Sequence, residues 1–203
     1  MARTLTLFMV LVVAIAFLAS PAEAQRFNAQ LSIGDACPAW ENLPGTDGKN
    51  HSLKDLEKAT AVVVVFTCNQ CPVAVAYEDR FMAFAKEYAE KGVKFVAINV
   101  NTSDSEKLPA MKERAAEKGF SFPYLYDESQ AIARNYGAQV TPHLYLLDGQ
   151  RKLAYVGAFD DNQDKSRVKE NYLKDAVEAV LAGKPVENAE TRPKGCGIGY
   201  KSQ

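Results

Sequence analysis

Two cysteines separated by two residues are the part of the sequence best suited to chemistry. They belong to the run Cys68-Asn69-Gln70-Cys71-Pro72. At the start of a helix, this spacing holds two sulfurs close enough to bridge, and the free N–H groups of the first turn stabilise the first thiolate. Because a thiolate is the nucleophile of disulfide exchange, we expect Cys68 to attack with a lowered pKa and Cys71 to act as the resolving thiol. An inert disulfide or half of a zinc site is the alternative.

The segments on either side of these cysteines indicate that they lie where a buried strand meets a helix. Residues 61–67 contain four consecutive valines, a pattern typical of a strand buried on both faces. Residues 72–91 have aromatic residues at helical spacing and are followed by Gly92, and residues 93–100 read as a second strand. A strand, helix and strand in this order predict a parallel crossover unit with the cysteines at its first turn.

The remaining segments predict an α/β protein with a mixed central sheet flanked by helices and an N-terminal hairpin extension. We expect the hairpin at 39–53, strands at 124–127, 143–147 and 152–159, and helices at 109–118, 129–136 and 167–182. Asp148-Gly149 is a hairpin signal between the last two strands. Asp160, Asp161 and Asp164 lack the spacing of a calcium loop and are expected to cap or precede the last helix.

Thr141 and Pro142 precede the expected strand at 143–147 and complete a specific pattern. A Cys-x-x-Cys at a strand-to-helix junction, followed later by Thr-Pro before a β-hairpin, resembles the thioredoxin fold. In detail the chain resembles the exported redoxins of the alkyl hydroperoxide reductase/thiol-specific antioxidant and TlpA-like group. The matching segments are FTCNQCP (66–72), YEDR (77–80), FVAINVN (95–101), FPYLYDES (122–129), TPHLYLLD (141–148) and GCGIGY (195–200). The resemblance implies a redox-active Cys68/Cys71 pair and a cis Pro142, with the Thr141 backbone presented to a partner disulfide.

Three departures from related families refine this expectation. Thioredoxins carry a buried acid where this chain has Val62, so the proton of the resolving thiol needs another acceptor. Close relatives often have His where this chain has Gln70, so we expect a less acidic Cys68 than in strongly oxidising relatives. The peroxiredoxin pattern Pro-x-x-x-Thr-x-x-Cys is absent, which places thiol-dependent peroxidase activity second to disulfide exchange.

Cys37 and Cys196 form a second pair of cysteines whose role is open. They lie near opposite ends of the expected mature chain, and a structural disulfide between them would tie the N-terminal segment to the tail. Free thiols, or a role in relaying electrons to Cys71, are the alternatives. The resemblance supports a role for Cys196 better than one for Cys37, because the Gly-Cys tail recurs in the family.

Metal binding is a further alternative for the same site. Cys68 and Cys71 with His143, which follows Pro142, would make a plausible copper or zinc set, and such a set would indicate a copper-handling protein. A buried histidine within a strand is the simpler interpretation. Disulfide exchange itself needs no organic cofactor.

The beginning of the chain and its charge predict where the protein acts and on what. Residues 1–24 have a basic start, an apolar run and Ala22-Glu23-Ala24, which predicts a signal peptide cleaved after Ala24 and a periplasmic or secreted protein without stable membrane insertion. We expect a redoxin domain over 25–186 and a tail over 187–203. With 24 basic and 25 acidic side chains, nucleic acid is not an expected partner. Protein disulfides or thiols, and an unidentified electron donor or acceptor, are the expected partners.

Overall fold

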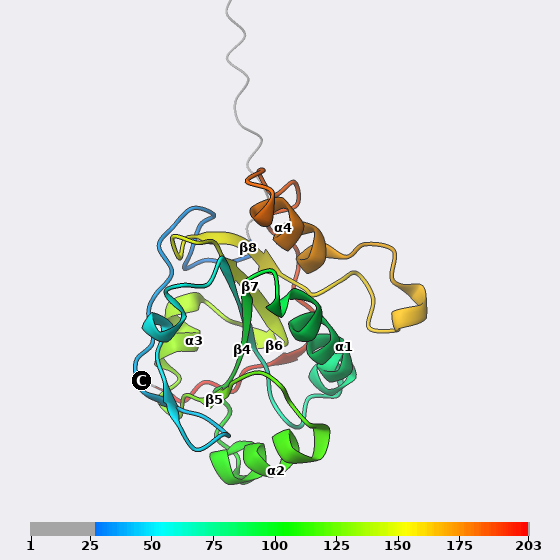
Figure 1. Ribbon diagram of the computed structural model, residues 1–203. Helices are drawn as coiled ribbons and strands as arrows, with labels where there is room; N and C mark the ends of the chain where they lie inside the picture. Colours follow the sequence, from blue (N-terminus) through cyan, green and yellow to red (C-terminus); the bar gives the residue numbers. More distant parts are fainter. Residues whose placement is uncertain (1–26, 203) are drawn as a thin grey trace, which may run out of the picture.

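A five-stranded mixed sheet forms the centre of the protein (Figure 1). The computed structural model describes residues 27–202, so the predicted signal peptide lies outside the described residues. The sheet has the strand order β5-β4-β3-β7-β8. Its strands are β3 (Ala61–Phe66), β4 (Val93–Asn99), β5 (Tyr124–Tyr126), β7 (His143–Leu147) and β8 (Leu153–Gly157). The first three run parallel, and β7 and β8 run antiparallel to their neighbours, which confirms the predicted α/β fold with a mixed sheet.

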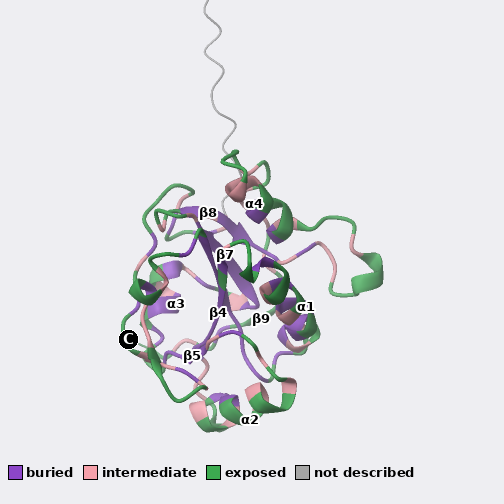
Figure 2. Ribbon diagram, in the orientation of Figure 1, coloured by how far each residue is buried: buried purple, intermediate pink, exposed green. Residues whose placement is uncertain are grey.

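Helices and the N-terminal segment cover the two faces of this sheet. The helices are α1 (Pro72–Ala89), α2 (Leu108–Lys118), α3 (Ala131–Tyr136) and α4 (Tyr172–Leu181). Alternate valines of β3 point to opposite faces, so Val63 packs with α1 and α4 whereas Val64 packs with α3 and Trp40. The central strand β3 and its neighbour β7 are buried at every residue (Figure 2). Burial on both faces explains why β3 lacks any polar residue.

Short elements depart from the prediction in informative ways. The expected N-terminal hairpin is present as β1 (Leu43–Pro44) and β2 (Asn50–His51), followed by η1 (Leu53–Leu56). The last helix is shorter than predicted, since η3 (Lys165–Arg167) is separate from α4. The sequence did not predict η2 (Asp104–Glu106) or the pairing of β6 (Val140–Thr141) with β9 (Cys196–Gly197). This pairing places the C-terminal tail beside Val140 and Thr141.

Within residues 27–202, no helix combines the length and apolar character needed to cross a membrane.

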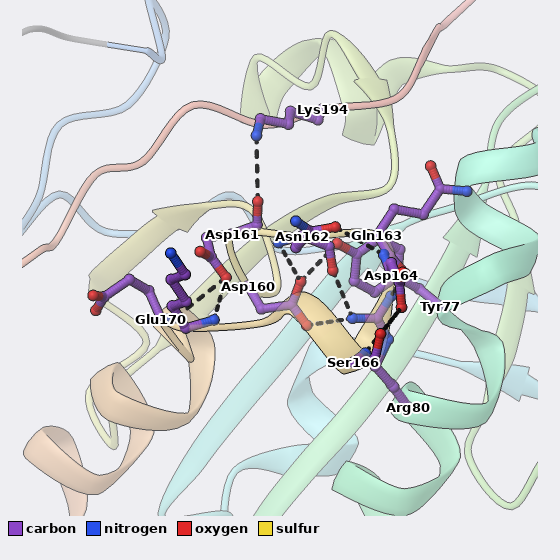
Figure 3. Close-up of polar contacts among 11 residues, drawn as sticks. Tyr77, Arg80, Asp160, Asp161, Asn162, Gln163, Asp164, Ser166, Glu170 and Lys194 are labelled. Carbon is purple, nitrogen blue, oxygen red and sulfur yellow. Dashed lines mark hydrogen bonds and ion pairs between the residues drawn. The ribbon is translucent and has the colours of Figure 1, made fainter.

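The acidic residues before α4 organise a loop rather than a metal site (Figure 3). Asp160 is buried, forms an ion pair with Arg80 of α1 and accepts a hydrogen bond from the Tyr77 hydroxyl. Asp161 accepts backbone N–H groups of 169 and 170, and Asp164 caps η3 by accepting the N–H of Ser166. All three carboxylates precede the last helix, α4, as expected, but Asp164 caps η3 instead of α4, and Asp160 joins the loop to α1.

Removing the charge of Asp160 should destabilise the protein strongly. Asp160→Asn leaves the Arg80 guanidinium buried without its counter-ion, and we expect a loss of about 3–5 kcal/mol in the free energy of unfolding, measured by urea titration. Asp79→Asn removes an exposed ion pair to Lys118 and is the matched control, expected to cost far less. Equal losses in the two variants would contradict a structural role for the buried pair.

Candidate functional site

Cys68 and Cys71 lie in the loop that joins β3 to α1. The strand ends at Phe66, Cys71 is the residue immediately before the helix, and Pro72 occupies its first turn, where a missing N–H leaves no hydrogen bond unmade. Each cysteine is only 4% exposed. The predicted strand-to-helix position of the pair is therefore confirmed, and both sulfurs lie beneath the surface.

Thr141 contacts both sulfurs of this loop. Pairing of β3 with β7 aligns Phe66 with His143 and so brings Thr141 and Pro142 beside the cysteines. The Thr141 hydroxyl lies 3.1 Å from Cys68 Sγ, and its carbonyl oxygen lies 3.1 Å from Cys71 Sγ. The Thr141–Pro142 peptide bond is cis, as the resemblance implies. Thr141 can thus donate a hydrogen bond to one sulfur and accept one from the other when Cys71 is a thiol.

Cys71 forms a disulfide with Cys196 in this structure, and Cys68 is a free thiol. The Cα atoms of the bridged residues are 5.9 Å apart. Backbone pairing of β6 with β9 brings Cys196 close to Cys71, because it places Cys196 directly opposite Thr141. The cysteine of the tail therefore joins Cys68 and Cys71, so that three sulfurs rather than two lie at Thr141.

The predicted structural disulfide between Cys37 and Cys196 is wrong. Cys37 is a buried free thiol whose N–H donates to the Arg151 carbonyl, next to the turn that joins β7 to β8. Cys196 pairs with Thr141 at the other end of β7, roughly 20 Å away for a strand of this length. Bridged cysteines need Cα atoms within about 7 Å. Burial and the charges of Asp148 and Asp35 raise the pKa of Cys37 to about 12, so this thiol is protonated at neutral pH.

The pKa of Cys68 is raised, in contrast to the lowering expected at a helix N-terminus. Burial is the largest cause. The Thr141 hydroxyl lowers the pKa, as do the backbone N–H groups of residues 70 and 71, but the negative charge of Glu106 raises it further. The expected stabilisation of the thiolate is therefore present but smaller than the opposing effect of burial.

Glu106 is the residue of this site that sequence reasoning missed. Its buried carboxylate accepts hydrogen bonds from the backbone N–H of Asn69 at 2.7 Å and of Gln70 at 2.9 Å, and from the Asn99 side chain at 2.8 Å. Two N–H groups between the cysteines are thus bound to a carboxylate. The order of the parallel strands could have predicted this position. Glu106 follows β4, and β4 ends beside β3 at the same edge of the sheet as the cysteines.

The residues proposed for a metal site are not assembled. Among residues 27–202, no three Cys, His, Asp or Glu side chains are grouped so as to hold a metal ion. The His143 ring packs on Tyr145, with Nδ1 3.2 Å from the Tyr145 hydroxyl, and burial lowers the pKa of His143 to about 3. Cys71 is also bound to Cys196. The copper or zinc set of Cys68, Cys71 and His143 is therefore not formed, and His143 is a neutral histidine of the core.

Comparisons with known proteins agree with this geometry. The sequence profile of the family described as Redoxin matches residues 32–173. Two solved structures are each 33% identical with a TM-score of 0.80 and cover 87% of this chain: a hypothetical protein from Sinorhizobium meliloti 1021, 98% of which is covered, and an uncharacterized conserved protein from Geobacillus kaustophilus, 96% of which is covered. A thiol:disulfide interchange protein of the thioredoxin family from Chlorobium tepidum TLS is 20% identical, with a TM-score of 0.59 over 74% of this chain and 98% of its own. A comparison with curated proteins gives no match. The thioredoxin-like fold is confirmed.

Replacing Glu106 should make Cys68 more acidic. Glu106→Gln removes the negative charge that raises the pKa of Cys68, so the pKa should fall. The ultraviolet absorbance of the thiolate during a pH titration measures it in the protein with the Cys71–Cys196 disulfide intact, where Cys37 is the other free thiol and its pKa is raised to about 12. Glu113→Gln, an exposed position of α2, is the control. A pKa that rises in Glu106→Gln would show that the carboxylate does not oppose the thiolate.

Replacing Thr141 should have the opposite effect. Thr141→Val keeps the shape of the side chain but removes the hydroxyl that hydrogen-bonds Cys68, so the pKa of Cys68 should rise. Its alkylation by iodoacetamide at neutral pH should slow correspondingly. Thr141→Ser retains a hydroxyl and should restore most of the rate. If serine and valine behave alike, the hydroxyl does not stabilise the thiolate.

Proposed function

Because the chain belongs to the redoxin family, we propose that it is an exported thiol–disulfide oxidoreductase whose Cys68 and Cys71 exchange disulfides with partner proteins. The observation that carries the proposal is the free Cys68 thiol at the start of a helix, with Cys71 and Thr141 beside it. Export is proposed from the apolar leader over residues 1–24. Protein disulfides are the proposed substrates.

Reduction of a partner begins at Cys68. The Cys68 thiol loses its proton, and the thiolate attacks one sulfur of the partner disulfide; a Cys68–partner disulfide forms and the other partner sulfur leaves as a thiolate. The Thr141 hydroxyl, 3.1 Å from Cys68 Sγ, supports this step because it can donate a hydrogen bond to the thiolate once Cys68 has lost its proton. The step requires Cys71 to be a thiol, since Cys71 must act next.

Cys71 completes the exchange. Its thiolate attacks Cys68 Sγ, which forms the Cys68–Cys71 disulfide and releases the partner as a thiolate. Before attack, the Cys71 thiol can donate to the Thr141 carbonyl, 3.1 Å away, which positions its sulfur. Val62 is part of the apolar core, so its position supplies no acid for this proton transfer, and we propose that solvent takes the proton.

Peroxide reduction is the second candidate, because a peroxidoxin from Mycobacterium tuberculosis, 21% identical with a TM-score of 0.54, is among the solved structures similar to this chain. A peroxidase needs a reactive thiolate, whereas burial and Glu106 raise the pKa of Cys68. The thiol is therefore better suited to exchange at elevated pH than to rapid attack on peroxide. Slow sulfenic acid formation at Cys68 with dilute hydrogen peroxide is the expected result.

Substitution of the two cysteines tests the proposed exchange. Cys68→Ser should reduce the rate of insulin reduction by dithiothreitol to that without protein, because the nucleophile is lost. Cys71→Ser should instead accumulate a mixed disulfide between Cys68 and the substrate, visible by non-reducing electrophoresis. Cys37→Ser is the control, since this thiol lies at the far end of β7. Undiminished turnover in Cys68→Ser would exclude the mechanism.

A further inference from the structure

The tail approaches the dithiol as an added strand. Its β9 runs antiparallel to β6 and aligns Cys196 with Thr141 and Gly197 with Val140. Thr141 is the residue that contacts both Cys68 and Cys71. The tail strand therefore pairs with the backbone that, by the family resemblance, is presented to a partner disulfide. Cys196 itself is exposed, in contrast to the two buried cysteines. The chain thus presents a cysteine of its own in the manner of a substrate.

We propose that Cys196 is a third redox-active thiol, which takes the disulfide over from Cys68 and Cys71 at the end of each exchange. The proposal rests on the proposed function, because it requires that exchange first yields the Cys68–Cys71 disulfide. The Cys196 thiol loses its proton and attacks Cys71 Sγ; the Cys71–Cys196 bond forms, the Cys68–Cys71 bond breaks, and Cys68 leaves as a thiolate that takes up a proton. No electrons are gained or lost overall. The product is the state of this structure, with Cys71 bound to Cys196 and Cys68 free.

Contacts on both sides of Cys196 hold the tail in place independently of the disulfide. Before it, the Thr191 hydroxyl accepts the N–H of Ala158, and the Thr191 backbone N–H donates to Val156 of β8. Between these contacts and β9, Lys194 donates to the Asp161 carbonyl of the loop in Figure 3. These contacts fix the direction from which the tail reaches Thr141.

The anchor after Cys196 is formed with α3. Ile198 is buried in the core, and the Tyr200 hydroxyl donates to the Ala138 carbonyl. Gln130 donates to the Gly199 carbonyl and accepts the N–H of Lys201. The end of the chain consequently lies beside α3 in Figure 1. With anchors on both sides, reduction of the disulfide leaves Cys196 close to Cys71, at a high effective concentration.

At Gly195 the backbone of the tail lies very close to the backbone of Thr141. A Cβ atom at this position would overlap the carbonyl oxygen of Thr141, so a larger residue would push the tail away from Cys71. Gly199, in the same tail, has open space where a Cβ would lie. A substitution at Gly195 therefore perturbs the position of the tail, and the same substitution at Gly199 is the matched control. Neither changes a cysteine.

The experiment follows the disulfide through time. The full-length mature protein is reduced, treated with oxidised glutathione, quenched with acid at intervals, alkylated and mapped by mass spectrometry. We expect the Cys68–Cys71 disulfide to appear first and the Cys71–Cys196 disulfide to grow as the first declines. Cys196→Ser should stop at Cys68–Cys71. Gly195→Ala should slow the second phase about tenfold or more, because the tail must shift, whereas Gly199→Ala should not change it.

Two outcomes would overturn the proposal. One is a Cys68–Cys71 disulfide that persists in the oxidised wild-type protein. The other is formation of Cys71–Cys196 at the same rate in Cys68→Ser as in wild type, because that disulfide would then arise without the active pair. Mixed-disulfide trapping by Cys71→Ser reports on the proposed function separately: trapping without migration removes only the role of Cys196, whereas no trapping removes the proposed function as well.

Discussion

Antiparallel pairing of β3 with β7 is the constraint on which the site depends. It places Thr141 against the loop that carries Cys68 and Cys71, and it leaves the backbone of β6 free to pair with a further strand. One residue therefore contacts two sulfurs through its side chain and carbonyl, and pairs with the residue that carries the third. The buried valines of β3 fix this arrangement because they anchor the strand on both faces of the sheet. The chemistry of the cysteines thus depends on the most rigid part of the fold.

The electrostatics of the site disfavour the thiolate form of Cys68. Glu106 binds the N–H groups of Asn69 and Gln70, and its charge and the burial of Cys68 disfavour the thiolate. A thiol with a raised pKa is a poorer leaving group, so a disulfide that includes Cys68 is broken less readily than one whose thiolate is well stabilised.

The sequence was most informative where a segment carries a strong local pattern. The apolar run of β3, the Cys-x-x-Cys spacing and the Asp148-Gly149 turn each reflect local chemistry, and the sheet, the position of the cysteines and the hairpin followed from them. The tail has no such pattern, because its strand contains two residues, one of them glycine. The pairing of cysteines could not be deduced either, since spacing along the chain does not determine connectivity. Glu106 was missed because its role depends on the end of a neighbouring strand and not on its own surroundings in sequence.

The number of residues between the bridged cysteines determines which disulfide is favoured before and after folding. Cys71 and Cys196 are 125 residues apart. In an unfolded chain, closing a loop of that length costs about 5 kcal/mol of entropy, against about 2 kcal/mol for the short Cys68–Cys71 loop. An unfolded chain therefore favours the short disulfide by about 3 kcal/mol. In the folded protein the anchors at Thr191 and Gln130 already hold the tail against β6, so this difference no longer opposes the long disulfide. Migration to Cys196 is accordingly coupled to the folded state, and the tail contacts contribute to the chemistry of Cys71 without touching its sulfur.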